Sequence, residues 1–191
     1  MKKMMLFSLL LLGGFSLANA QIEKGSLMLG GTGGLNLTDL SDESGTGTMF
    51  AFNVAPNIGY FITDGLAVGA AVGLGFSSND IGNTNSFNFG PLARYYIALA
   101  DSAIKPFATA SINLGRATNN PDQGEKTTLD NRSFLLGVGA TYFLTKNIGL
   151  EAILGYNNMK TTSDVSGFEV ENTVSNIGLN FGFQIFLGAN E

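Results

Sequence analysis

Bulky apolar side chains recur at every second position along most of the chain, and this pattern constrains the fold more than any other feature of the sequence. Between Phe50 and Ile62 the even-numbered positions are bulky, whereas most odd-numbered positions are small or polar. Because successive strand residues point to opposite faces of a sheet, this pattern predicts a strand with two different faces. Further segments repeat it, two of them (27–37 and 106–114) more loosely, and together they predict eight strands: 27–37, 48–62, 66–76, 86–99, 106–114, 133–142, 148–157 and 176–185.

The composition of the smaller face indicates what surrounds the sheet. A secreted lipocalin-type barrel would also alternate, but its outer face would carry many charged residues in water. Here the smaller face is mainly Gly, Ala, Ser and Asn, and charged residues make up only 13% of the chain, about half of the usual share in a globular domain. Small residues suit the narrow interior of an eight-stranded barrel. The bulky face is therefore predicted to contact lipid.

The connections between the predicted strands alternate in length. After Gln21 no run of roughly 18 apolar residues predicts a membrane-spanning helix, whereas strands of about ten residues are long enough to cross a bilayer. Short turns and long polar loops alternate, which places both termini at the short-turn end and predicts an all-β fold, an eight-stranded antiparallel up-and-down transmembrane β-barrel. The short turns are predicted at 63–65, 100–104 and 145–147, and the long loops at 39–47, 77–85, 117–130 and 159–171.

Two local features qualify this prediction. Pro91 lacks a backbone N–H in the middle of a predicted strand, so we expect a bulge or a local distortion there. Aromatic residues next to the short turns predict an interfacial girdle, composed of Tyr60, Phe61, Tyr95, Tyr96, Tyr142 and Phe143.

The first twenty residues have the pattern of a secretory signal peptide. Lys2 and Lys3 precede an apolar run over residues 4–12, and a small-x-small cleavage site follows at residues 18–20. We therefore expect residues 1–20 to be a cleaved signal peptide and residues 21–191 to form the barrel domain. The expected location is the outer membrane of a Gram-negative bacterium, with the chain crossing the membrane several times.

The tract Gly59-Tyr60-Phe61-Ile62-Thr63-Asp64-Gly65-Leu66-Ala67-Val68-Gly69 resembles the first periplasmic hairpin of small outer-membrane β-barrel proteins, the "porin family" with barrels of the OmpX and OmpA type. Glu151 resembles a carboxylate often found after a late periplasmic turn in that group. The resemblance covers residues 21–191. In two respects the sequence departs from the family: the family usually ends on an aromatic residue, whereas Phe186 is followed by five further residues, and we expect no peptidoglycan-binding domain after the barrel.

Enzymatic chemistry is not expected. The resemblance class includes lipid A deacylases, acyltransferases and proteases that rely on histidine for proton transfer, but this chain has no histidine. The glycine-rich segment 30–34 lies inside a predicted strand and lacks the lysine and helix of a phosphate-binding loop. No cofactor or metal site is predicted, and no basic patch suggests nucleic acid binding.

Arg94 and Glu151 are the charged pair of greatest interest. Both fall on the smaller face, a few residues from predicted short turns. We expect them to form an ion pair inside the barrel and, with neighbouring Asn and Gln side chains, to plug it. The pair either fixes the structure or acts as a gate, and the structural role is favoured.

The predicted function is that of an integral outer-membrane barrel with a structural role or a surface role carried by its loops; the alternative is a narrow passive channel for ions or small solutes. The expected partners are outer-membrane lipid, lipopolysaccharide, the outer-membrane assembly machinery during biogenesis and an extracellular partner at the loops. The barrel is expected to be a monomer. The loops carry most acidic residues: Asp39, Asp42, Glu43, Asp80, Asp122, Glu125, Asp164 and Glu169.

Overall fold

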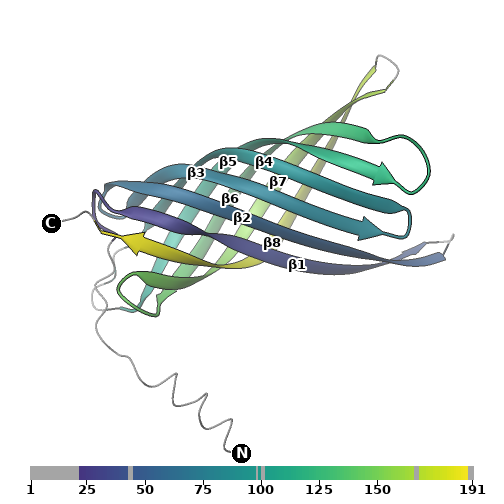
Figure 1. Ribbon diagram of the computed structural model, residues 1–191. Helices are drawn as coiled ribbons and strands as arrows, with labels where there is room; N and C mark the ends of the chain where they lie inside the picture. The colour runs from purple at the N-terminus through teal and green to yellow at the C-terminus, as the bar shows by residue number, and fades with distance from the viewer. Residues whose placement is uncertain (1–21, 43–44, 98, 100–101, 166–167, 189–191) are drawn as a thin grey trace, which may run out of the picture.

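A computed structural model describes residues 22–42, 45–97, 99, 102–165 and 168–188 of the chain. Within them eight antiparallel strands close into one barrel in sequence order, each strand paired with the next and β8 with β1 (Figure 1). This confirms the predicted fold class. None of the described segments is a helix long and apolar enough to span a membrane. The strands are β1 (Leu27–Asp42), β2 (Gly45–Thr63), β3 (Leu66–Asn79), β4 (Gly82–Tyr96), β5 (Ile104–Pro121), β6 (Thr127–Phe143), β7 (Ile148–Val165) and β8 (Phe168–Leu187).

The bulky apolar positions face outward, as the alternation predicts. Along β3, for example, Val68, Val72 and Leu74 are exposed, while the glycines between them are half-buried in the wall of the lumen. All other strands also present large exposed apolar side chains. The closed sheet provides hydrogen-bond partners for most strand backbone groups, which is what allows a sheet to survive in hydrocarbon.

The two ends of the barrel differ. Leu27 pairs with Leu187, so the first and last strands meet at the end that also carries the connections 64–65, 97–103 and 144–147; we call it the terminal end. At the opposite end, the hairpin end, the predicted long loops are wrong. The strands continue through most of those residues and leave only the connections 43–44, 80–81, 122–126 and 166–167 between them.

These hairpins form because their polar residues can still pair backbone to backbone. Thr118 pairs with Thr128, and Lys160 pairs with Thr173, so residues of the predicted loops 117–130 and 159–171 take part in the ladders. Strands of 14 to 20 residues exceed the roughly 9–11 that a crossing needs, so the hairpins project beyond the apolar band. Of the predicted acidic loop residues, Asp80, Asp122 and Glu125 lie in the connections; the other five carry side chains outside the described part of the structure.

Of the two outcomes expected at Pro91, a bulge or a local distortion, the structure shows a local distortion and no bulge. The register between β4 and β5 is the same on both sides of it, but the pairing skips from Phe89–Leu114 to Leu92–Ser111. Pro56 has the same effect on β2, where the pairing to β3 skips from Val54 to Asn57. Each proline therefore interrupts one ladder locally because it has no N–H to donate. Among the described pairs of β2 and β3, the register shifts once, between Phe61 and Thr63.

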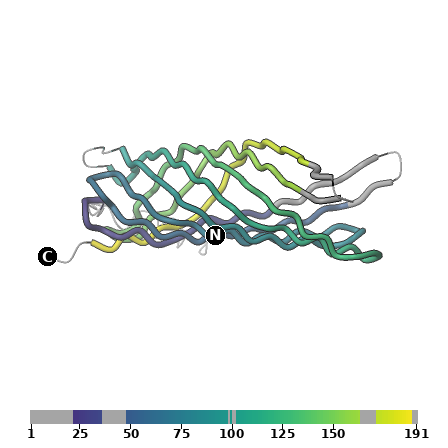
Figure 2. Tube along the Cα trace, turned by 90° about the horizontal axis from the view of Figure 1, so that it is seen from above, coloured from purple at the N-terminus to yellow at the C-terminus, as the bar shows by residue number. Residues whose placement is uncertain are grey.

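The pairing between β1 and β8 is much shorter than the others. It runs over seven residue pairs, from Leu27–Leu187 to Gly33–Phe181, whereas β7 and β8 pair over their full common length from Ile148 to Val165. Beyond Gly33 and Phe181 the two strands separate (Figures 1 and 2). The barrel is thus closed at the terminal end and has a gap in its wall toward the hairpin end, which we call the seam.

Candidate functional site

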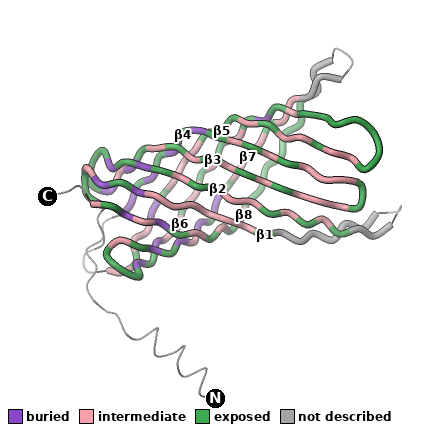
Figure 3. Tube along the Cα trace, in the orientation of Figure 1, coloured by how far each residue is buried: buried purple, intermediate pink, exposed green. Residues whose placement is uncertain are grey.

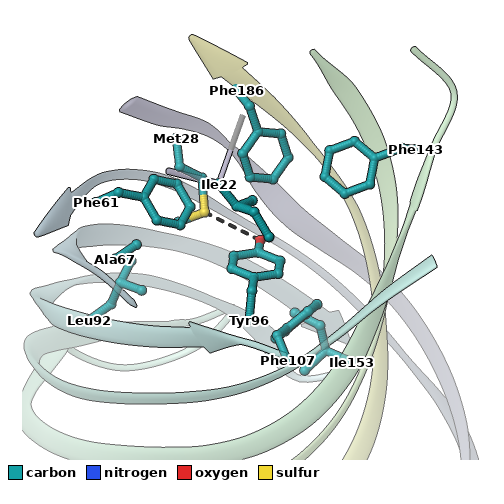
Figure 4. Packing of buried hydrophobic residues seen from close by; sticks show 10 residues of the cluster. All are labelled: Ile22, Met28, Phe61, Ala67, Leu92, Tyr96, Phe107, Phe143, Ile153 and Phe186. Atoms are coloured by element: carbon teal, nitrogen blue, oxygen red, sulfur yellow. Dashed lines mark hydrogen bonds between the residues drawn. The ribbon is translucent and has the colours of Figure 1, made fainter. Parts of the chain in front are cut away.

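The buried side chains of the barrel gather at the terminal end, where residues coloured as buried are concentrated in Figure 3. Five aromatic rings fill the lumen there and form what we call the aromatic plug: Phe61, Tyr96, Phe107, Phe143 and Phe186 (Figure 4). Ring centroids lie 5.0 Å apart for Phe143 and Phe186 and 5.2 Å apart for Tyr96 and Phe107. Such tilted arrangements are favoured between aromatic rings.

The aromatic plug corrects the predicted girdle. Because neighbouring strand residues point to opposite faces, only one member of each adjacent pair can reach the lipid. The outward members are exposed, whereas the inward members are at most 4% exposed and belong to the plug. The girdle at this end therefore contains Tyr60, Tyr95 and Tyr142, and it lacks Phe61, Tyr96 and Phe143.

Glycines opposite the large side chains make room for them. Gly139 pairs with Phe107 across β5 and β6, and a Cβ at Gly139 would lie 2.7 Å from the Phe107 ring. Gly59 stands in the same relation to Met28, whose methyl group would lie 2.9 Å from an added Cβ. At these two positions the absence of a side chain makes room for the large side chain on the paired strand. This accounts for part of the high glycine content.

A short segment before β1 covers the terminal end of the plug. Ile22 is buried against the aromatic rings (Figure 4), and its carbonyl accepts a 2.9 Å hydrogen bond from the N–H of Gly65. Gly65 has φ of +79°, which favours glycine in this turn. The side chain of Asp64 accepts a 2.8 Å hydrogen bond from the N–H of Lys24. Residues before β1 are thus bound to the β2–β3 turn.

Arg94 and Glu151 lie next to the plug and contact each other across the lumen. Arg94 Nη1 lies 2.8 Å from each of the two carboxylate oxygens of Glu151. The two residues are 4% and 3% exposed. The structure therefore brings together the two charged residues that the sequence singled out.

Glu151 accepts further hydrogen bonds from three neutral side chains. The hydroxyls of Tyr96 and Thr141 donate to Oε1 at 3.1 and 2.9 Å, and Gln184 Nε2 donates to Oε2 at 3.3 Å. With Arg94, these residues form what we call the Glu151 cluster. Its members come from β4, β6, β7 and β8, so one carboxylate connects strands on opposite sides of the barrel.

The surroundings of Arg94 also favour a buried charge. Its guanidinium carbon lies 4.4 Å from the centre of the Phe107 ring, within reach of a cation–π interaction. Its Nη1 also lies 3.2 Å from the Tyr96 hydroxyl. Within the Glu151 cluster, Arg94 Nε and Gln184 Oε1 are buried without a hydrogen-bond partner among the described residues. The two buried charges are therefore compensated by each other and by several neutral groups, as buried ion pairs require.

Sequence reasoning did not identify Thr141 or Tyr96 as partners of the pair, although both lie on the inward positions of their strands. Of the Asn and Gln neighbours it expected, Gln184 joins the cluster. Gln184 pairs with Gly30 on one side and Gly149 on the other, and a Cβ at Gly30 would lie 2.4 Å from its side chain. The inward position of Gln184 could be read from the alternation, but its facing glycines follow from the register between strands, which alternation alone does not give.

Toward the hairpin end the lumen widens into a cavity of about 580 Å³. Its floor includes Leu92, Ile153 and Arg94, directly above the Glu151 cluster. Its walls are mainly neutral and polar: the lining residues with amide side chains are Asn53, Asn57, Asn88, Asn113, Asn157, Asn176 and Asn180. The lumen is therefore polar and open in its upper part and filled with side chains at the terminal end.

The described side chains do not include a group of three or more potential acidic ligands placed to hold a metal ion. In the Glu151 cluster the carboxylate and the guanidinium bind each other. They therefore neutralise each other's charge and link the strands that carry them. The buried position of the cluster separates the cavity from the terminal end.

Comparison with known proteins places this architecture in a family. The family described as outer membrane protein beta-barrel domain matches residues 7–183. No curated protein sequence matches the chain significantly.

Three solved structures share the fold. Neisserial surface protein A is 20% identical with a TM-score of 0.50, over 85% of this chain and 97% of its own. OprG from Pseudomonas aeruginosa is 13% identical with a TM-score of 0.55, over 87% and 98%. The outer membrane protein W of E. coli is 16% identical with a TM-score of 0.54, over 85% and 98%. Because the family model covers residues 7–183 and the barrel has the fold of these structures, the chain belongs to the outer membrane protein β-barrel domain family.

Proposed function

We propose that this protein is a closed barrel in the outer membrane of a Gram-negative bacterium, with a structural role and with hairpins available for contacts outside the cell. The observation that carries this proposal is the filling of the lumen at the terminal end. The aromatic plug and the Glu151 cluster occupy successive inward positions of the strands there, so ions would have to displace buried side chains to pass. The hairpins, which project beyond the apolar band, support the surface role.

The alternative function is a narrow passive channel, and conductance distinguishes the two. We expect the purified protein in planar bilayers to give no discrete current steps. Truncating the plug at its centre, in Tyr96→Ala/Phe186→Ala, is expected to open a path and to produce current. The matched control is Tyr95→Ala/Phe183→Ala, which removes two neighbouring rings that face lipid and should stay silent. Steps from the wild type, or equal currents from both variants, would contradict the closed barrel.

Lipopolysaccharide is the partner for which the outer surface offers chemistry. Arg132 and Lys160 are paired across β6 and β7, next to Leu114 of β5, and both are exposed. The pair lies at the edge of the apolar band: Arg132 is two residues from Phe134 and four from Leu136 on β6. Like charges opposite each other destabilise a sheet, and an anionic phosphate between them would offset this repulsion.

The acidic residues nearby do not neutralise both Arg132 and Lys160. Asp130 bonds Arg116 at 2.8 Å and Glu171 bonds Lys160 at 2.6 Å, whereas Arg132 has no ion pair among the described residues. We expect Arg132→Ala/Lys160→Ala to retain several-fold less lipopolysaccharide per barrel than the wild type, measured as bound phosphate after detergent extraction. Lys126→Ala, in the connection 122–126 away from these two residues, serves as the control. Equal retention by all three proteins would refute this partner site.

A further inference from the structure

We propose that the seam between β1 and β8 admits an amphiphile from the membrane into the cavity. The ligand would have one apolar chain and an uncharged head group that forms hydrogen bonds. This binding site is separate from the proposed structural function and does not require ions to pass through the barrel. Four features of the described residues support it: the end of the β1–β8 ladder, the depth of the gap, the lining of the cavity and its closed floor.

The ladder ends while both strands continue. Beyond the last pair, Gly33–Phe181, β1 runs on to Asp42 and β8 begins as early as Phe168. The backbone N–H and C=O groups that face the gap have no strand partner across it. Unpaired backbone at membrane depth is tolerated only where it is buried in protein or lines a cavity. The seam therefore needs either water from the lumen or a polar ligand group beside it.

The gap begins within the apolar band. The outward positions of β8 that follow the last pair are Leu179 and Ile177, and both are apolar. Ile177 is 73% exposed, and Leu35 on the facing edge of β1 is 68% exposed, because each pairs with a neighbouring strand on one side only. A Cβ added to Gly178 would meet no atom within 4 Å. The edges of the seam are thus apolar, bordered by open space and level with the lipid chains.

The cavity behind the seam is continuous with these edges. Leu35, Ile177 and Leu179 belong to its lining together with the asparagines of the inner wall. Seven asparagines, among them Asn57, Asn88 and Asn113, supply amide groups to this lining. Apolar edges and an amide-lined interior match a molecule with a tail at the seam and a hydroxyl-bearing head inside.

The charge and the depth of the cavity define the ligand further. Among the described lining residues Arg94 alone is charged, and its charge is compensated by Glu151. An ionised head group would therefore find no free counter-charge on the described walls, so an uncharged head is favoured. The floor is closed by Leu92, Ile153 and the Glu151 cluster, which makes the cavity a binding site with a single closed end.

The test uses a tryptophan inside the cavity and a quencher dissolved in the membrane. The chain has no tryptophan and no cysteine, so introduced residues report without background. Ser111→Trp places the probe on the cavity wall of β5, away from the seam. The protein is reconstituted in lipid nanodiscs, and 12-bromododecan-1-ol is added as the amphiphile. We expect strong quenching of the probe, as for Leu114→Trp, which faces lipid.

A covalent staple across the seam makes the test specific. Leu35 and Leu179 would face each other if the register of the last pair continued. The variant Leu35→Cys/Leu179→Cys is therefore oxidised to a disulfide. If the two sulfurs are too far apart for a disulfide, they are cross-linked with dibromobimane. The matched control, Leu29→Cys/Ile185→Cys, staples two outward residues that are already paired. We expect the seam staple to remove most of the quenching at Ser111→Trp and the control staple to leave it unchanged. Quenching that survives the seam staple, or no quenching before stapling, would overturn the proposal.

Discussion

We expect Glu151→Ala to lower the free energy of unfolding by about 3–5 kcal/mol, because the substitution leaves the buried Arg94 without its counter-charge. The loss goes beyond the ion pair, since the carboxylate also accepts hydrogen bonds from Tyr96, Thr141 and Gln184. Buried donors that lose their acceptor keep the full cost of their desolvation. The substitution should therefore weaken contacts among four strands at once.

The measurement is urea unfolding in detergent or lipid, followed by the change in gel mobility between folded and unfolded barrels. Asp130→Ala is the matched control: it breaks an ion pair of the same length, 2.8 Å, whose side chains are 72% and 69% exposed. Exposed pairs contribute roughly 0–1 kcal/mol. Arg94→Met/Glu151→Leu, which removes both charges, should recover part of the loss. Equal stabilities of Glu151→Ala and Asp130→Ala would show that the buried cluster does not stabilise the fold.

Phe186→Ala is expected to cost about 3–5 kcal/mol, the range found for buried Phe→Ala substitutions that leave a cavity. The side chain is fully buried and packs against Phe61, Tyr96 and Phe143 at centroid distances of 6.3, 5.8 and 5.0 Å. Because the strand backbones of a closed barrel cannot move inward freely, the neighbouring rings can fill the void only in part. The lost ring contacts and the remaining void both lower the free energy of unfolding.

The control for this prediction lies three residues earlier on the same strand. Phe183 faces outward and is 51% exposed, so Phe183→Ala removes a ring from the lipid contact surface without creating an internal void. Its expected cost is the transfer contribution alone, about 1.5–3 kcal/mol. Unfolding curves of the two variants in the same lipid compare them directly. A greater loss in Phe183→Ala than in Phe186→Ala would mean that the plug is not a packed core.

The fold and the position of the ion pair could be predicted because period-two alternation determines which face each side chain occupies. Once the face with small residues is assigned to the lumen, Arg94 and Glu151 must both point inward. Their predicted nearness to the terminal end follows from the turns that precede or follow them. The partners Thr141 and Gln184 depend on the register between strands, which alternation alone does not determine.

The plug and the hairpins were harder to predict for physical reasons. At Tyr60-Phe61, Tyr95-Tyr96 and Tyr142-Phe143 both faces carry an aromatic residue, so composition no longer distinguishes lumen from lipid. At the hairpin end, the polar residues lack the apolar alternation that marks a strand. These residues pair because they continue ladders that begin in the membrane. Whether they pair therefore depends on the neighbouring strand and not on the local sequence.

The short ladder between β1 and β8 has a consequence for how the sheet forms and opens. All other strand neighbours are consecutive in the chain and are linked by a connection, whereas these two strands come from opposite ends of the polypeptide and share seven residue pairs. Their union requires the closure of the longest loop in the molecule and offers few bonds in return. During folding, neighbouring strands should therefore pair hairpin by hairpin, and β1 and β8 should pair last. Thermal fluctuations should separate β1 from β8 before any other two neighbouring strands.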